Sequence, residues 1–214
     1  MLRLIESDDD IRIGLDHLVG IEPRFGPMLA AAGVVPLRRT EAGFRGLCRI
    51  IVAQQVSVAS AASIWARILA RYPGLSHNDI ACASESDLRA CGLSGPKIRT
   101  LLAITEATMA GRLDFSALAA ITAAEVRAVM TAVRGVGPWT TDIYLMFGLG
   151  HADTFAPGDL ALQEAVRIGF GFDARPAARD LAAMAEAWSP WRAVAARLLW
   201  AYYAAAKRRE GVGL

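Results

Sequence analysis

The sequence has few cysteines, few aromatic residues and little net charge. Its three cysteines, Cys48, Cys82 and Cys91, show no Cys-x-x-Cys spacing, so neither a disulfide framework nor a four-cysteine iron–sulfur cluster is available. Aromatic residues make up 7% of the chain and hydrophobic residues 54%, a balance that favours packed helices over sheets. The net charge of +2 does not by itself indicate a nucleic-acid partner, so any such binding needs local clusters of Lys and Arg.

We expect neither a signal peptide nor a membrane-spanning segment in this sequence. Its first residues include Glu6 and the acidic run Asp8–Asp10, where a signal peptide needs basic residues and then an apolar run. No later apolar stretch reaches membrane-spanning length without a charge. We therefore expect a soluble protein of the reducing cytoplasm that does not enter a membrane.

Apolar residues recur at three- and four-residue spacing in several segments, separated by Gly, Pro, Ser or Asp, which predicts about ten helices and no strand. The clearest segments are Phe44–Val56, Val58–Tyr72, Lys97–Ala110, Ala123–Arg134, Leu160–Gly169 and Pro190–Lys207. The fold class is therefore all-α. We expect a helical lead over residues 1–42 that packs with the C-terminal lobe over 151–214, and a central helical lobe over 43–150. Such packing gives two lobes with a cleft between them.

Basic residues gather in three short stretches, and each stretch taken alone is typical of a solvated helix end. These stretches hold Arg38, Arg39, Arg45 and Arg49, then Lys97 and Arg99, and finally Lys207, Arg208 and Arg209.

A Gly-x-Gly sequence separates two of the expected helices, at Gly135-Val136-Gly137. The two glycines allow a tight or left-handed backbone, and Pro138 suits the first position of a new helix. The turn then offers backbone N–H groups at a helix N-terminus, where a phosphate is favoured without any base being read. Gly-x-Gly is common, and an ordinary turn is the alternative interpretation.

Asp159 stands at the start of another expected helix, after Pro157 and Gly158. On position alone it is an N-cap, which helices favour at this place. Capping and function are compatible, because a carboxylate at a helix N-terminus is stabilised and held by backbone donors. A fixed carboxylate also suits stabilisation of an oxocarbenium-like sugar or activation of a water molecule.

The two helices around the Gly-x-Gly turn, followed by a Gly/Pro loop and Asp159, resemble the helix-hairpin-helix DNA glycosylase superfamily. Within it the chain is similar to the bacterial 3-methyladenine DNA glycosylase II branch. Three segments carry the closer likeness, which covers residues 43–207: Ile51–Val58, Trp188–Arg192 and Leu199-Trp200. The resemblance implies the helix-hairpin-helix glycosylase fold, with two helical lobes around a DNA-binding cleft.

The resemblance also implies roles for single residues. Asp159 is then the catalytic residue, and Trp139 and Trp200 line the base pocket. Gln54 and Gln55 contact the damaged site or the opposite strand through their amides, or else cap and bridge helices. Trp65, Trp188 and Trp191 are expected in the core instead.

Two segments are implied to contact DNA. The hairpin segment, Gly135, Val136, Gly137 and Thr140, is implied to hold a DNA phosphate, with a monovalent cation coordinated by the backbone at Gly135 and Gly137. The second segment, Leu93, Ser94, Gly95 and Lys97, resembles the family's wedge loop. Leu93 is its only large apolar residue, and the alternative is that Leu93 makes a buried contact at a helix end.

Position 139 separates two reaction types within the superfamily. Bifunctional relatives place a Lys there, as a nucleophile that forms a Schiff base. This chain has Trp139, so the resemblance implies a monofunctional enzyme without an iron–sulfur cluster: water attacks, the base leaves and an abasic site remains.

Alkylated purines such as 3-methyladenine and 7-methylguanine are the expected substrates, because a positively charged base attracts aromatic faces and leaves readily. The expected partner is double-stranded DNA with damaged bases, bound by a monomer in the cytoplasm at the nucleoid. The alternatives are a non-catalytic DNA-binding protein and a glycosylase for deaminated or etheno bases.

Overall fold

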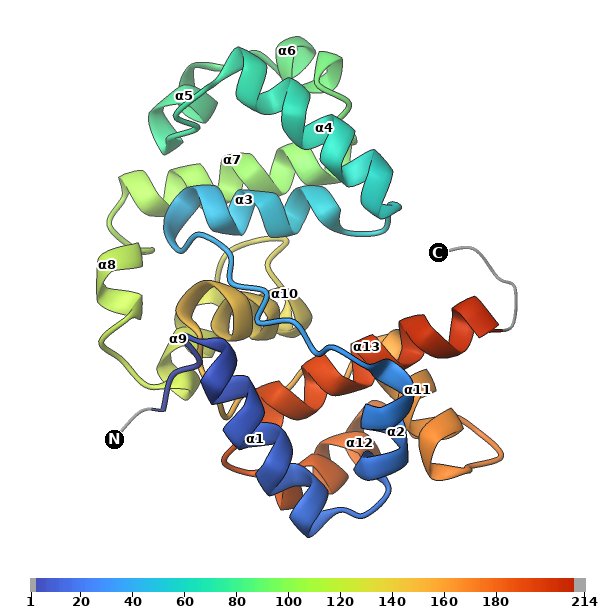
Figure 1. The fold of residues 1–214 in the computed structure, drawn as a ribbon. Coiled ribbons are helices and arrows are strands. Elements are labelled where there is room, and N and C mark those ends of the chain that lie inside the picture. The colour runs from blue at the N-terminus through green and yellow to red at the C-terminus, as the bar shows by residue number, and fades with distance from the viewer. Residues whose placement is uncertain (1–2, 210–214) are drawn as a thin grey trace. The chain divides into compact units, whose positions relative to one another are not determined.

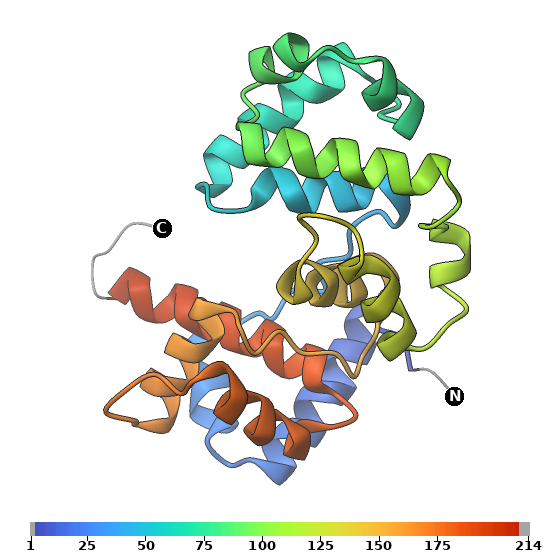
Figure 2. The same ribbon diagram turned by 180° about the vertical axis from the view of Figure 1, so that it is seen from behind.

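The computed structural model describes residues 3–209, and these are largely helical (Figures 1 and 2). Residues 1–2 and 210–214, at the ends of the two expected outer segments, lie outside the described residues. Within residues 3–209 the β-type pairing is limited to one isolated antiparallel bridge between Leu4 and His151. The all-α expectation is therefore confirmed. No helix in this range has both the length and the apolar character needed to cross a membrane.

The chain forms two compact units, and the second is inserted into the sequence of the first. Unit 1 joins Met1–Arg39 to Gly150–Leu214, and unit 2 is the continuous stretch Thr40–Leu149. The helices of unit 1 are α1 (Asp8–Ile21), α2 (Phe25–Ala32), α11 (Leu160–Phe170), α12 (Ala178–Ala185), a 3-10 turn (Glu186–Trp188) and α13 (Arg192–Arg209). The helices of unit 2 are α3 (Gly43–Ala53), α4 (Val58–Arg71), α5 (His77–Cys82), α6 (Glu85–Ala90), α7 (Gly95–Met109), α8 (Phe115–Leu118), α9 (Ala123–Thr131), α10 (Pro138–Ile143) and a π-helical segment (Tyr144–Leu149).

Unit 1 is built around the first half of α13, the red helix of Figure 1. Every residue from Ala193 to Leu199 is buried, and α1, α2 and α11 pack against α13. A helix that is buried on all sides needs an almost wholly apolar sequence, and four of these residues are small alanines or a valine that let the neighbouring helices approach. The one charged residue in this run is Arg197.

Arg197 keeps its charged group bonded within the packed unit. Its Nε donates to the carbonyl oxygen of Leu37 at 2.9 Å and its Nη1 to that of Ala193 at 2.9 Å. Burial, with smaller contributions from Arg39 and Arg38, lowers the pKa of Arg197 to about 10. The bond to Leu37 ties the segment after α2 to the central helix.

An aromatic cluster also lies in the core of unit 1. The Trp188 ring meets Phe25 at 5.2 Å, Phe155 at 5.4 Å and Phe170 at 6.3 Å between ring centroids, each edge to face. Trp188 and Trp191 are 2% and 3% exposed, which confirms the core expectation for both. The cluster matters for the site because Phe155 belongs to the loop that leads to Asp159.

In unit 2, α3 and α7 lie side by side (Figures 1 and 2). The Nζ of Lys97 donates to the carbonyl oxygen of Val52, at the end of α3, at 2.7 Å. The buried Tyr144 hydroxyl accepts the backbone N–H of Gly43, at the start of α3, at 2.8 Å. Both ends of α3 are therefore held by side chains from later helices.

Trp65 does not enter the core of unit 2, so this expectation was wrong. The helix α4 buries Ile64 and Ile68, four residues apart on one face. Trp65 stands beside that stripe, half-buried, and lines an open apolar hollow of about 470 Å³ with Val56 and Val58. Because Trp65 lies just off the buried face of α4, its side chain is only half-buried.

Two glycines of α1 give a test of the packing in unit 1. A Cβ at Gly14 would lie 2.7 Å from Val194 Cγ2 and 3.0 Å from the Trp191 ring, whereas one at Gly20 meets nothing within 4 Å. We expect Gly14→Ala to lower the free energy of unfolding by about 1–3 kcal/mol through overpacking. Gly20→Ala, the matched control, should raise it by up to about 1 kcal/mol through helix propensity. Urea unfolding measures both, and equal effects would contradict the close approach of α1 to α13.

Candidate active site

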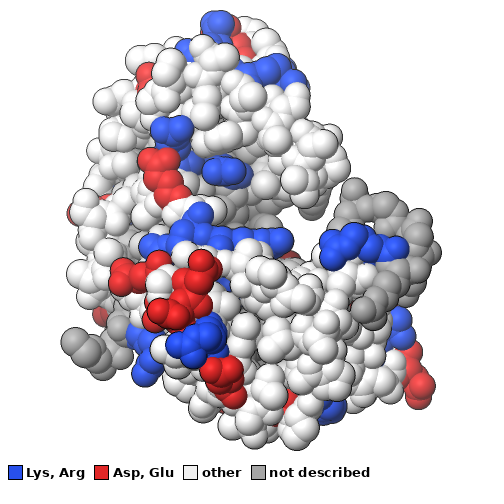
Figure 3. Space-filling view, in the orientation of Figure 1, with Lys and Arg blue, Asp and Glu red and all other residues white. Residues whose placement is uncertain are grey.

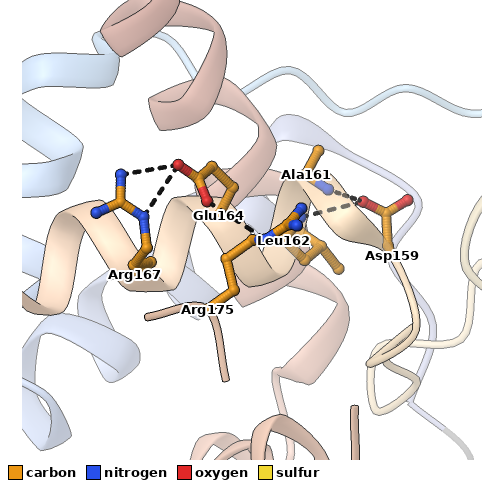
Figure 4. A network of polar contacts seen from close by, with 6 residues as sticks. All are labelled: Asp159, Ala161, Leu162, Glu164, Arg167 and Arg175. Carbon is orange, nitrogen blue, oxygen red and sulfur yellow. Dashed lines mark hydrogen bonds and ion pairs between the residues drawn. The ribbon is translucent and has the colours of Figure 1, made fainter. Parts of the chain in front are cut away.

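Asp159 caps the N-terminus of α11, as the sequence predicts. Its Oδ1 accepts the backbone N–H of Ala161 at 2.9 Å and that of Leu162 at 3.1 Å (Figure 4). Its own backbone is extended, with φ −75° and ψ 118°. The N-cap geometry therefore turns the carboxylate back toward the first turn of the helix and fixes its orientation.

Trp200 holds the same carboxylate oxygen from another helix. Its indole Nε1–H donates to Oδ1 of Asp159 at 3.2 Å, and both side chains are half-buried. Trp200 directly follows the fully buried part of α13, so its backbone is firmly placed while its side chain reaches the surface of unit 1. The structure thus brings together two residues that are 41 positions apart in the sequence.

The loop before Asp159 is held by its own bonds and contacts. The Asp159 N–H donates to the carbonyl oxygen of Ala156 at 3.0 Å, and the Gln163 side-chain amide donates to that of Pro157 at 3.0 Å. Phe155 packs on Trp188 in the core. Gln163 was missed by the sequence analysis, although its position four residues after Asp159, on the same helix face, was the available signal.

A second charged group lies further along α11, away from the capping carboxylate (Figure 4). Glu164 accepts two hydrogen bonds from Arg167, at 2.8 and 3.1 Å, and pairs with Arg175 at 3.8 Å. The hydrogen bonds from Arg167 lower the pKa of Glu164, and burial opposes them. This acid is thus engaged with arginines in a structural network.

The Gly-x-Gly sequence forms the expected hairpin between α9 and α10. Gly135 has φ +87°, and a Cβ there would collide with the Thr100 side chain on α7. The Val136 N–H donates to the carbonyl oxygen of Val133 at 3.0 Å, and the Val136 side chain is 3% exposed. Gly137 is the N-cap of α10, and Pro138 occupies the first helical position.

The resemblance implies a cation that is coordinated by the backbone at the hairpin, and one of the two expected ligands is the carbonyl oxygen of Gly137. The carbonyl oxygen of Gly137 accepts the Thr141 N–H at 3.0 Å and the Thr141 hydroxyl at 3.1 Å. This oxygen is therefore directed along α10 and already bonded twice, so it does not fit a cation ligand. Within residues 3–209, no group of three or more His, Cys, Asp or Glu side chains is arranged to hold a metal ion.

Beside the hairpin, unit 2 has a hollow of about 360 Å³ lined by five residues that the sequence analysis singled out: Gln54, Gln55, Gly135, Trp139 and Thr140. The Gln54 amide Nε2 donates to Thr140 Oγ1 at 2.8 Å, which links the end of α3 to α10. Gln55 is exposed and has φ +54°, a left-handed conformation that is uncommon outside glycine. The lining carries indole, amide and hydroxyl groups and no ionisable side chain.

In the segment that resembles the wedge loop, the structure bears on the two alternatives for Leu93. Leu93 is 4% exposed and packs in the core of unit 2, so the structure favours its alternative as a buried contact at a helix end. Ser94 is exposed, and Gly95 begins α7. Lys97 is engaged with Val52, and burial lowers the pKa of its amine. The expected site residues therefore fall into a group in unit 1, Asp159 and Trp200, and a group in unit 2 around the hollow.

Comparison with known proteins shows the family to which the chain belongs. The family model described as HhH-GPD superfamily base excision DNA repair protein matches residues 48–192, more than half of the chain. DNA-3-methyladenine glycosylase 1 of Schizosaccharomyces pombe is 26% identical over 211 residues, which cover 92% of this chain and 91% of the relative.

Two solved structures have similar folds. The S. pombe 3-methyladenine DNA glycosylase Mag1, in complex with abasic DNA, has a TM-score of 0.78 and 25% identity, over 87% of this chain and 94% of the other. A DNA-3-methyladenine glycosidase from Bacillus halodurans has a TM-score of 0.77 and 28% identity, over 99% of this chain and 95% of the other.

The two hairpin glycines should respond differently to a methyl group. Gly135→Ala forces a positive φ on alanine and a collision with Thr100, so we expect the free energy of unfolding to fall by about 1–3 kcal/mol. At Gly137 the backbone is extended and a Cβ meets nothing within 4 Å, so Gly137→Ala should cost less than about 1 kcal/mol. Chemical unfolding of both variants measures the difference, and a larger loss at Gly137 would contradict the hairpin geometry.

Proposed function

Because this chain belongs to the HhH-GPD superfamily of base excision DNA repair proteins, we propose that it is a monofunctional DNA glycosylase that releases alkylated purines. Its substrates are 3-methyladenine and 7-methylguanine in double-stranded DNA, and its product is an abasic site. It acts as a monomer in the cytoplasm, at the nucleoid. The similarity to 3-methyladenine glycosylases over nine-tenths of the chain supports the substrate class.

The observation that carries the proposal is the fixed carboxylate of Asp159. Three N–H donors, from Ala161, Leu162 and Trp200, converge on one of its oxygens. Preorganised charge of this kind stabilises a transition state without reorganisation at the moment of reaction. An N-cap alone needs only the two backbone donors, and the indole bond adds orientation that capping does not require.

The reaction breaks the bond between the sugar C1′ and the ring nitrogen of the base. The electron pair of that bond leaves with the base and neutralises its positive charge. The Asp159 carboxylate stabilises the cation that develops on the sugar and takes the proton of the water that adds to C1′.

The hollow of unit 2 suits a leaving group that is already activated. Its lining holds Trp139, Gln54, Gln55 and Thr140 but no acid that could protonate a neutral base. An indole face attracts a positively charged ring, so the hollow favours alkylated purines over deaminated or etheno bases. The lining also contains no lysine, and the Lys97 amine is bonded to Val52, which supports hydrolysis by water without strand cleavage.

Extrusion of a base leaves a gap in the duplex that a side chain has to fill. Leu93 is buried and does not reach outward. Gln55 is exposed and lines the hollow, and its left-handed backbone turns the chain between α3 and α4. We therefore assign the gap-filling role to Gln55.

We expect Asp159→Asn to lower the rate of base release by about 10²-fold or more, because the charge is lost while the capping oxygen remains. DNA affinity should stay within about twofold, since phosphate contacts supply most of it. The assay incubates the protein with methylated duplex DNA and separates the released bases by chromatography.

Asp114→Asn is the matched control for this change. Asp114 caps α8 through the N–H groups of Ser116 and Ala117, so the same substitution is made at another Asp N-cap. Its base release should equal that of the parent. If the parent protein binds DNA without releasing any base, the non-catalytic DNA-binding alternative is indicated. If it releases only deaminated or etheno bases, the alternative glycosylase for those bases is indicated.

Gln55→Gly removes the side chain while keeping a residue that tolerates a positive φ. We expect the preference for duplex DNA with an abasic-site analogue over undamaged duplex to fall about tenfold, because the vacated space is no longer filled. Fluorescence anisotropy with both duplexes measures the ratio. An unchanged ratio, with folding intact by circular dichroism, would remove Gln55 from this role.

A further inference from the structure

Three arginines of unit 2 surround the loop that joins α6 to α7. They are Arg67 on α4, Arg89 on α6 and Arg99 on α7, and all three are exposed. In the space-filling view, basic side chains are visible at the α4 and α6 end of unit 2, with acidic side chains beside them (Figure 3). We call these three residues the arginine cluster.

Two glycines of the loop make room for the guanidinium groups. A Cβ at Gly92, which has φ +96°, would collide with Arg67. A Cβ at Gly95 would lie 3.3 Å from Arg99 Nη1 and 3.4 Å from Arg89 Nη2, so both groups approach the same glycine. Larger residues at these places would displace the arginines from the loop.

The positions of two of the arginines are set by further bonds. Arg67 donates from Nε to the carbonyl oxygen of Cys91 at 2.9 Å and from Nη1 to Ser63 Oγ at 2.7 Å. Arg89 donates from Nε and Nη2 to Glu85, at 2.9 and 2.6 Å. Glu85 therefore offsets one of the three positive charges.

Arg99 differs from the other two. Among residues 3–209 its side chain has no hydrogen bond or ion pair with another residue, although it lies along Gly95 beside Arg89. The two guanidinium groups place positive charge near one backbone position, and Glu85 offsets only the charge of Arg89, so the charge of Arg99 is left to attract an anion. Beside Arg67, an open hollow of about 460 Å³ is lined by Ser60, Ser63 and Gly92, which adds hydroxyl groups. Guanidinium and hydroxyl donors in this arrangement match a phosphate group.

The cluster is connected to the hairpin by a single stretch of α7. Thr100, the residue after Arg99, is the one that closely approaches Gly135. From Gly95 to Thr100 the helix rises about 7.5 Å, at about 1.5 Å per residue. Each strand of duplex DNA carries one phosphate per about 3.4 Å of helix axis, so a backbone that meets the hairpin has further phosphates at separations of this order.

We propose that the arginine cluster is a second phosphate-binding site, which holds the backbone of duplex DNA at the α6–α7 loop while the hairpin holds it elsewhere. The proposal rests on the proposed function in taking DNA as the partner. Because the net charge is only +2, such a local cluster supplies the attraction that bulk charge does not. It adds sequence-independent affinity and no base recognition.

The test compares Arg99→Ala with the parent in the binding of undamaged and abasic-analogue duplexes between 50 and 300 mM NaCl, by fluorescence anisotropy. We expect the slope of log affinity against log salt to decrease by about one, with the same loss of affinity, about fivefold, for both duplexes. Arg99→Lys should recover most of the slope. Base release in single turnover, with the protein in saturating excess, should stay unchanged.

Arg112→Ala is the matched control, because Arg112 is an exposed arginine just beyond the other end of α7, paired with Glu106 at 2.8 Å. Its salt slope should equal that of the parent. Equal slopes for Arg99→Ala and Arg112→Ala would overturn the proposal, as would an effect confined to one duplex.

Two further outcomes remain. The first distinguishes free phosphate from the DNA backbone as the ligand, and the second distinguishes the arginine cluster from the proposed glycosylase function. A site for free phosphate would show binding of inorganic phosphate by calorimetry that Arg99→Ala removes without changing the DNA slope, and this overturns the proposal. If the slope of log affinity against log salt depends on Arg99 but the protein releases no base, the result supports the arginine cluster and rejects the proposed glycosylase function.

Discussion

The hydrogen bonds on one oxygen of Asp159 are the constraint on which unit 1 depends for its chemistry. Two of the donors belong to the first turn of α11 and the third to the indole of Trp200 on α13. The capping carboxylate is thus held by two helices that pack against each other. Any change that separates α11 from α13 changes the position of the carboxylate, so the core of unit 1 also acts as the support of the site.

The packing of unit 1 places both the donors and the loop around the half-buried carboxylate of Asp159. The buried run from Ala193 to Leu199 places Trp200, and the aromatic contact between Phe155 and Trp188 places the loop that precedes Asp159. Functional groups need to be held within a fraction of an ångström by their surroundings. Here a close-packed helix and an aromatic cluster provide this precision, and the only charge within the run, Arg197, is bonded to backbone carbonyls.

The elements that depend on local sequence were predicted well. Asp159 follows a glycine and precedes an amphipathic segment, which is enough to identify an N-cap, and the two hairpin glycines identify a turn between helices. Residues whose state depends on tertiary packing were not predictable. Leu93 stands in a polar loop and is buried, whereas Trp65 stands on a helix beside the buried face and remains half-exposed. The left-handed backbone of Gln55 had no signal either, because the residue type disfavours it.

The order of the two units along the chain has a consequence for biosynthesis. Unit 2 is continuous, so all of its helices have been translated by Leu149, whereas the helices of unit 1 come from both sides of that insertion. Domains generally fold as units while the chain is being made, the earlier one first. The apolar faces of α1 and α2 that pack against α13 therefore stay uncovered until α13 is translated. A nascent or prematurely terminated chain that ends between Leu149 and Trp200 has the complete hairpin but lacks the indole that orients Asp159.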